Sequence, residues 1–140
     1  MPNKYKKGDS MELLIAFGTD DGKNFNNDHF GMAKYYYIYS FCDEKQKLVE
    51  QRENVKFEGD ESMKHGDPKK ANATSDVLQG VDVLVANKFG PNLLRILKKF
   101  VCVVSRKKAI NDAIKLINQN LDNIIKEKNK TINRKHIVLR

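Results

Sequence analysis

Three short runs of the chain are apolar at nearly every position: residues 11–18, 81–86 and 101–104. In the first run, Leu13, Ile15 and Phe17 fall on one face of an extended segment, whereas Leu14 and Ala16 fall on the other. Apolar side chains on both faces are typical of a central strand that is covered from two sides. The pattern therefore predicts three buried strands in the interior of a sheet.

A different alternation follows the first of these runs. In the stretch AKYYYIYSFC, the aromatic side chains of Tyr35, Tyr37, Tyr39 and Phe41 share one face. A tight turn comes next, and then a weaker alternation over residues 47–55. The pattern predicts an antiparallel hairpin whose second strand lies at an edge of the sheet. We expect the aromatic face to be core rather than a stacking platform.

Helical signals occupy the rest of the chain. Asp67-Pro68 has the form of an N-cap followed by proline in the first turn, and it predicts a helix over about residues 69–79. A second helix is expected over residues 92–100. A last helix, with Ser105 as a candidate cap, carries one apolar stripe at helical spacing: Ile110, Ala113, Ile114, Ile117, Leu121, Ile124 and Ile125.

The expected order of elements is β-β-β-α-β-α-β-α. Its second half, βαβα, requires parallel strands joined by right-handed crossovers, so the sheet should be mixed and carry helices on its faces. Ligands of such sheets bind beyond the carboxyl ends of the parallel strands. Here those ends lead into loops 18–31 and 87–91, so the fold class alone directs attention to the loop that contains His29.

Composition sets few further limits. The chain has 140 residues, of which 40% are hydrophobic and 31% charged, and this suits one domain with its own core. No apolar run approaches the roughly 18 residues of a membrane span, and residues 1–10 contain no apolar stretch of the secretory kind. We therefore expect a cytoplasmic protein without membrane contact.

The net charge of +8 is concentrated at the two ends of the chain. Residues 126–140 hold six Lys or Arg and one Glu, and residues 1–10 hold three Lys and one Asp. The body between them is nearly neutral. A basic tail binds polyanions weakly and without sequence preference, or is simply solvated. We expect any affinity for nucleic acid to reside in residues 126–140.

The side chains that could carry catalysis or hold a cluster are few. Cys42 and Cys102 are far apart and form no C-x-x-C pair, so we expect reduced thiols and no four-thiolate set for an iron–sulfur cluster. A metal-dependent hydrolase would need carboxylates that converge on the metal, but Asp20 and Asp21 are adjacent in a turn. No Ser-His-Asp set, Cys-His pair or phosphate-binding loop is legible. We expect no enzymatic activity.

Two histidines stand in polar loops that could present a metal ligand. A neutral imidazole at His29 could ligate iron, copper or zinc, and Asp28 or Asp20 could orient the ring. His65 precedes a helix N-terminus, whose positive end favours a neutral imidazole beside an anionic cluster. Each histidine could equally be a loop residue with only local hydrogen bonds or solvent contacts.

Three stretches carry a family resemblance: IAFGTDDGKNFNNDHFGMAKYYYIYSF, the HGD before the first helix, and LQGVDVLVANKFGPNLLRILKK. Over about residues 12–118 the chain resembles the dinitrogenase iron–molybdenum cofactor biosynthesis family, of the NifX, NafY and NifB C-terminal type. The resemblance implies an α/β fold, ribonuclease H-like, with three α/β/α layers and a five-stranded mixed sheet. It also implies a prokaryotic, nitrogen-fixation-related carrier of an iron–sulfur or iron–molybdenum-type cluster, whose partners are cluster donor or acceptor proteins.

The resemblance also implies site residues in this sequence. Those implied to bind the cofactor are His29, Gly31, Asp20, Gly22, Gly90 and Pro91, and those implied to ligate metal are His29 and His65. Gly90-Pro91 opens a helix whose free N–H groups could hold a phosphate or a cluster sulfide. The chain departs from many members in lacking a cysteine shortly after the second histidine. The alternative function is a metal-free protein-interaction module of the same fold.

The predicted site unites His29, His65 and Gly90 in one shallow pocket, with Phe30 and Phe89 as apolar walls. Because the loop of 13 residues around His29 is polar, we expect it to bury little and to be mobile without cargo. The expected division of the chain is a flexible N-terminal extension, one domain and a basic tail: residues 1–11, 12–125 and 126–140.

Overall fold

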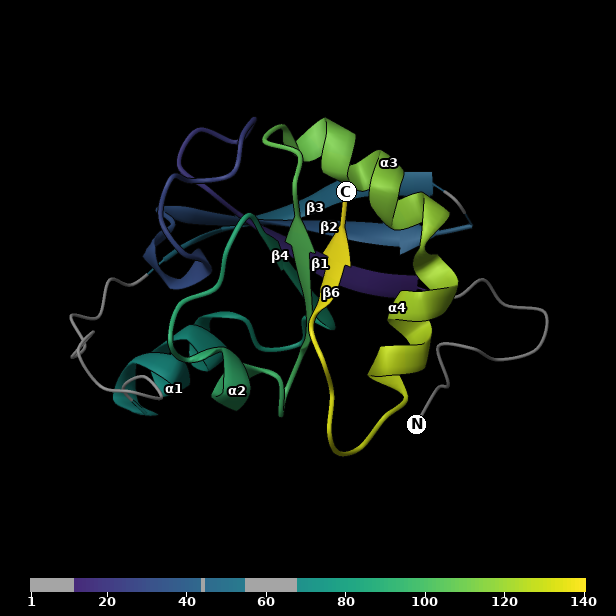
Figure 1. Ribbon diagram of the computed structural model, residues 1–140. Helices are drawn as coiled ribbons and strands as arrows, with labels where there is room; N and C mark the ends of the chain where they lie inside the picture. The colour runs from purple at the N-terminus through teal and green to yellow at the C-terminus, as the bar shows by residue number, and fades with distance from the viewer. Residues whose placement is uncertain (1–11, 44, 55–67) are drawn as a thin grey trace.

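The computed structural model describes residues 12–43, 45–54 and 68–140. The described elements, in chain order, are β1 (Glu12–Thr19), η1 (Phe30–Met32), β2 (Tyr35–Cys42), β3 (Lys45–Glu53), α1 (Pro68–Val77), β4 (Val83–Ala86), α2 (Leu93–Ile96), β5 (Val101–Ser105), α3 (Ile110–Gln119), α4 (Leu121–Lys128) and β6 (Ile137–Leu139). They form one sheet with helices on both sides (Figure 1). The predicted extension over residues 1–11 lies outside the described residues.

The sheet has the strand order β3-β2-β1-β4-β5-β6. β1, β2 and β3 are antiparallel neighbours, whereas β1, β4, β5 and β6 run parallel to one another. The predicted hairpin and the mixed sheet are therefore confirmed. Helices α3 and α4 cover one face, and α1 and α2 cover the other, which gives the three α/β/α layers (Figure 1).

The apolar alternation in β1 separates the two cores as predicted. Leu13, Ile15 and Phe17 pack in the cluster that includes the buried residues of α3 and α4, whereas Ala16 packs on the other face with Tyr36. All five side chains are at most 1% exposed. Burial from both sides explains why this strand is apolar at successive positions.

The sheet has six strands rather than the five that were predicted. The sixth, β6, lies within the segment that charge marked as a tail, and it pairs in parallel with β5. Only three residues form this strand, and Leu139 at its end is 6% exposed. Three apolar residues among lysines and arginines are too few to show the alternation of a strand. The predicted number of strands was therefore wrong.

Three expectations about the helices also need correction. The long last helix is two helices, because Asn120 leaves the helical backbone and donates its side-chain N–H to the Leu116 carbonyl at 2.8 Å. The helix expected over residues 92–100 is only the four residues of α2. Ser105 ends β5 and accepts a hydrogen bond from the backbone N–H of Lys107, so it caps no helix.

The aromatic face of β2 is core at one end only. Phe41 is 3% exposed and Tyr39 packs against the same cluster, but Tyr35 at the start of the strand is 40% exposed. The expectation of an aromatic core is therefore correct for part of the strand. On the opposite face, Tyr36 is fully buried, and burial raises the pKa of its hydroxyl.

Candidate functional site

The loop after β1 is anchored to the loops that follow the neighbouring parallel strands. Its two phenylalanines, Phe25 and Phe30, are 2% and 0% exposed. The backbone N–H of Phe25 donates to the carbonyl of Lys108, after β5, and that of Phe30 donates to the carbonyl of Lys88, after β4, both at 3.0 Å. The expectation that this loop buries little is wrong, because its polar sequence conceals two core side chains.

Three side chains fix the carbonyl groups around η1. Asn26 donates to the carbonyls of Asp28 and His29 at 3.0 and 3.1 Å. Asn54, at the end of β3, donates to the carbonyls of Gly31 and Ala33 at 3.0 and 2.7 Å. The buried hydroxyl of Tyr36 donates to the Phe30 carbonyl at 3.1 Å. Satisfied carbonyls on a short, irregular segment hold its backbone, and therefore hold His29, in one position.

His29 packs directly against Gly90 in the loop after β4. A methyl group built on Gly90 would lie 2.9 Å from the Cγ and Nδ1 atoms of the imidazole. No real side chain tolerates that separation, so the close approach requires a glycine. The His29 side chain keeps 17% of its surface exposed. The structure thus joins two of the three predicted site segments at the carboxyl edge of β1 and β4.

The space beside His29 is small. A cavity of about 10 Å³ is lined by residues of η1, α1 and the segment around α2: His29, Phe30, Gly31, Thr74, Phe89, Gly90, Pro91, Asn92 and Ile96. It has room for at most one water molecule. Phe30 and Phe89 form an apolar wall, as expected, with their ring centroids 5.4 Å apart. A cluster could therefore reach His29 only at the protein surface.

Asn92 is a polar residue of this cavity that the sequence did not reveal. It is 7% exposed, and its Oδ1 atom has no hydrogen-bond partner within the described part of the chain. Buried polar atoms are normally paired, so an unpaired oxygen marks a place of interest. Nothing in the spacing or charge of residues 91–93 distinguishes this asparagine from an ordinary turn residue, and the same holds for Thr74.

Asp28 is a carboxylate directly beside the candidate ligand. Its Oδ1 accepts a hydrogen bond from the backbone N–H of His29 at 2.7 Å and lies 3.9 Å from Nε2 of the ring. At 3.9 Å the carboxylate makes no hydrogen bond to the ring, so its role in orienting the imidazole stays a prediction. Asp20 accepts the backbone N–H of Lys34 at its Oδ1 at 2.9 Å and borders a different cavity from His29.

Asp20 and Gly22 belong to a separate turn. Asp20 and Asp21 border another cavity, of about 140 Å³, on the far side of the loop. The backbone N–H groups of Asn24 and Lys23 donate to the Asp21 carboxylate and lower its pKa from 3.8 to about 2. Gly22 has φ +79°, and a methyl group there would lie 2.6 Å from the Tyr37 hydroxyl. These contacts give Asp20, Asp21 and Gly22 a structural role, because they stabilise the turn.

The part of the chain that the structure describes brings no further histidine, cysteine or carboxylate to the lining of the cavity beside His29. The described residues contain no group of three or more His, Cys, Asp or Glu side chains that could hold a metal ion. Cys102 is buried, which raises the pKa of its thiol and keeps it protonated. Both cysteines are free, as expected. The position predicted for His65 lies outside the described residues, and α2 is too short to offer an anion site at its N-terminus.

Comparisons with known proteins agree with the fold. The chain aligns with the crystal structure of a candidate dinitrogenase from Methanocaldococcus jannaschii at TM-score 0.56 and 15% identity, covering 78% of this chain and 90% of that one. The NMR structure of that protein gives TM-score 0.59 and 18% identity, with 80% and 92% covered. At such identities the likeness shows the fold alone.

A search of curated proteins finds no match. In the part of the chain that the structure describes, no helix is both long and apolar enough to cross a membrane. The profile of the family described as dinitrogenase iron–molybdenum cofactor, a family involved in the biosynthesis or binding of that cofactor, matches residues 11–120. The chain therefore belongs to the dinitrogenase iron–molybdenum cofactor family.

Proposed function

We propose that the protein is a non-catalytic carrier or accessory protein that binds a preformed iron–sulfur or iron–molybdenum-type cluster through His29. The observation that carries the proposal is the position of the His29 imidazole, which packs against Gly90 between the loops that follow β1 and β4. Ligands of open α/β sheets bind at this edge. Family membership supports a cluster of this class as the cargo.

The donor set fits attachment of a finished cluster better than assembly of one. Assembly on a scaffold commonly uses several thiolates, whereas the chain has two cysteines, of which Cys102 is buried. One imidazole can replace a single exchangeable ligand of a cluster that already exists. His65 remains a predicted second ligand. In this proposal the protein acts in the cytoplasm, where it receives the cluster from a donor protein and passes it to an acceptor protein. The ribonuclease H-like assignment of its fold is part of the same proposal.

The proposal is tested by cluster transfer under anaerobic conditions. The full chain is mixed with a synthetic cubane iron–sulfur cluster that carries exchangeable thiolate ligands, and it is then separated by gel filtration. We expect the protein fraction to retain iron and visible absorption, and the His29→Ala variant to lose both. His136→Ala is the matched control, because His136 is exposed in the segment before β6 and lies outside the cavity.

Two outcomes would count against the proposal, the first against the site at His29 and the second against the carrier function itself. Retention of the cluster by His29→Ala, with loss in His136→Ala, would move the site to the C-terminal segment. A colourless, iron-free wild-type fraction would instead favour the metal-free interaction module. That alternative has its own support in the described residues, since the cavity beside His29 measures only about 10 Å³ and no group of three metal-ligating side chains exists there.

A metal-dependent hydrolase is the least supported function. It would need two or more carboxylates aimed at a shared metal. Asp20 and Asp21 instead accept hydrogen bonds from the backbone N–H groups of Lys34, Lys23 and Asn24. These carboxylates are occupied in holding the loop, so they offer no converging pair.

A further inference from the structure

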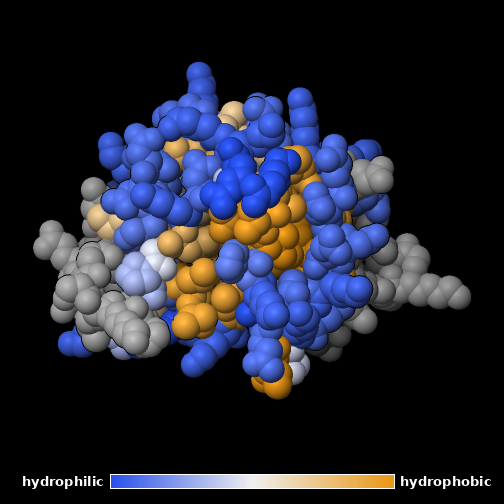
Figure 2. All heavy atoms as spheres, in the orientation of Figure 1, coloured by the Kyte–Doolittle hydropathy of each residue, from blue (hydrophilic) through white to orange (hydrophobic). Residues whose placement is uncertain are grey.

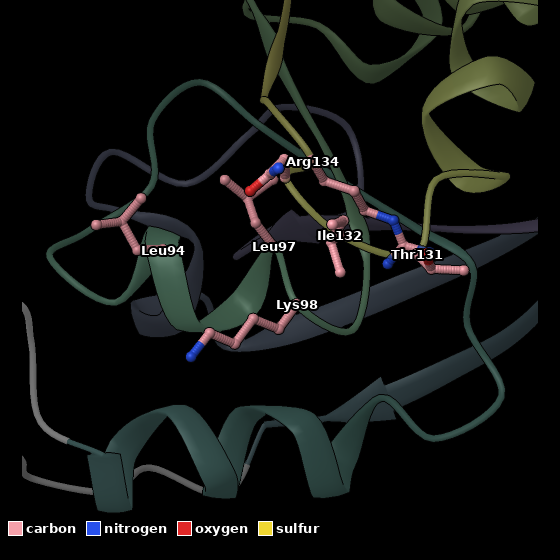
Figure 3. A pocket seen from close by; sticks show the side chains of 7 residues that line it. Leu94, Leu97, Lys98, Thr131, Ile132 and Arg134 are labelled. Atoms are coloured by element: carbon pink, nitrogen blue, oxygen red, sulfur yellow. The ribbon is translucent and has the colours of Figure 1, made fainter.

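A large hollow lies between α2 and the loop that joins α4 to β6 (Figure 3). Its volume is about 580 Å³, and it is lined by residues from both segments: Leu94, Leu97, Lys98, Thr131, Ile132, Asn133 and Arg134. We call it the α2 groove. It shares no lining residue with the cavity beside His29, although Asn92 and Ile96 of the same segment line that cavity.

The walls of the α2 groove are unusually apolar for a surface. Leu94 is 61% exposed and Ile132 is 72% exposed, while Leu97 beneath them is buried. Figure 2 shows apolar side chains gathered between α2 and the edge of the sheet at β6, with hydrophilic side chains around them. Exposed apolar side chains that gather on one face inside a polar rim are a feature of protein-binding surfaces.

Both walls carry more basic than acidic side chains, although Glu127 forms an ion pair with Lys130 at 2.6 Å next to the second wall. Residues 93–100 contain Arg, Lys and Lys, and residues 129–136 contain Lys, Arg and Lys, with no Asp or Glu in either segment. Lys98 has no ion-pair partner in the described part of the chain. Arg134 donates to the carbonyls of Glu127 and Lys128 at 3.2 and 2.9 Å, which fixes this cation beside the groove. The charge complement of such a surface is an acidic partner.

The groove depends on a part of the chain that the family profile does not reach. The profile ends at residue 120, and the second wall of the groove comes from residues 131–134. The first wall, from α2, lies within the family match, whereas the second wall lies outside it. α4 ends in the carbonyls that Arg134 binds, so the short helix, the loop and β6 together build the second wall.

We propose that the α2 groove is a docking surface for an acidic protein segment that presents apolar side chains. Its volume lies within the range of ligand pockets, and the exposure of Leu94 and Ile132 calls for a partner broad enough to cover both. Nucleic acid fits less well, because the lining contains no aromatic side chain on which a base could stack. A membrane fits less well, because the surface is hollow rather than convex. The inference is independent of cluster binding.

The test begins with the full chain and a displayed library of random peptides. We expect selected peptides to combine Asp or Glu with Leu, Ile or Phe, and their binding to weaken as salt rises. Leu94→Glu and Ile132→Glu should each weaken the binding of a selected peptide at least tenfold. Each substitution removes an apolar contact and adds a carboxylate that repels the acidic peptide. Both positions are exposed, so both variants should fold, which circular dichroism checks.

The matched control is Leu48→Glu, which makes the same change at a 38% exposed leucine of β3, the opposite edge strand. Its affinity for the selected peptide should equal that of the wild type. Failure to enrich any acidic, apolar peptide would overturn the proposal, as would equal binding by the Leu94→Glu variant. Leu94-dependent binding of a single-stranded oligoribonucleotide, or of phosphatidylglycerol vesicles, without peptide binding would also overturn it. None of these outcomes depends on whether His29 binds a cluster.

Discussion

The two hollows beside α2 differ in nearly every physical property. The cavity beside His29 measures about 10 Å³, is lined by Phe30 and Phe89, and lies wholly within the residues that the family profile matches. The α2 groove measures about 580 Å³, is open, and takes one wall from residues beyond that match. The larger hollow is therefore not where the family's site is expected.

The difference lies in what the polar side chains do. Around His29, the side-chain amides of Asn26 and Asn54 donate hydrogen bonds to backbone carbonyls, and these bonds hold the irregular segment around η1 in a single geometry. Along the groove, Lys98 is exposed and the apolar side chains of Leu94 and Ile132 face solvent. The first arrangement holds the backbone around His29 in place. The second leaves apolar surface that a partner could cover.

The sharpest way to break this comparison is to truncate one apolar side chain on each side of α2. Phe30→Ala should reduce the free energy of unfolding by about 3–5 kcal/mol, because a fully buried phenylalanine leaves a cavity when it is removed. Leu94→Ala should change it by no more than about 0.5 kcal/mol, because Leu94 is mostly exposed. Urea denaturation measures both values. Equal losses would show that the groove is part of the core.

A smaller effect is expected from the two side chains that each serve two carbonyls. Asn54→Ala leaves the carbonyls of Gly31 and Ala33 without a donor in a buried place, and should cost about 2–3 kcal/mol. Arg134→Met should cost less than about 1.5 kcal/mol, because its carbonyl partners at the end of α4 can turn to water. Thermal unfolding of both variants gives the ranking. The reverse order would mean that the C-terminal segment, not the site loop, is the better anchored region.

The contact between His29 and Gly90 can be isolated by a double-mutant cycle. Gly90→Ala should lower the free energy of unfolding by about 1–2 kcal/mol, because the new methyl group overlaps the imidazole. In a His29→Ala background the same change should cost about 1 kcal/mol less, since the obstructing ring is gone. Gly80→Ala, at a position with φ +85° and open space, is the control and should show no coupling to His29→Ala. Additive costs at Gly90 would place the ring elsewhere in solution.

Much of the fold could be predicted from local patterns. The double-sided apolar run of β1 identified a central strand with two cores, and the alternation around residues 35–42 identified the hairpin. The rule that ligands bind beyond the carboxyl ends of parallel strands directed attention to the loops of His29 and Gly90, and the structure does place them in contact. Each of these inferences needed only a repeat of two residues or a general rule of sheet topology.

What the sequence concealed depends on partners distant along the chain. The break at Asn120 leaves the apolar stripe intact on both sides, so its period could not reveal two helices. Asn54 contacts carbonyls 21 and 23 residues away, and Phe30 fills a core from within a polar loop. Such positions are set by tertiary packing, which a short sequence window does not contain. The same reason explains why the α2 groove, built from segments more than 30 residues apart, was not foreseen.

The smallest expected effect concerns Asp21, which holds the turn on the far side of the His29 loop. Its pKa is lowered from 3.8 to about 2 by the N–H groups of Asn24 and Lys23, so the ionised form stabilises the folded state. That contribution is fully present above pH 3.8 and is lost as the pH falls through about 2. The melting temperature of Asp21→Asn should thus lie slightly below that of the wild type at neutral pH, and the two should converge near pH 2. Asp76→Asn, the same substitution at an exposed aspartate of α1, is the control for the loss of one carboxylate. A gap that persists below pH 2 would mean that Asp21 stabilises the turn through its shape and hydrogen bonds rather than through its charge.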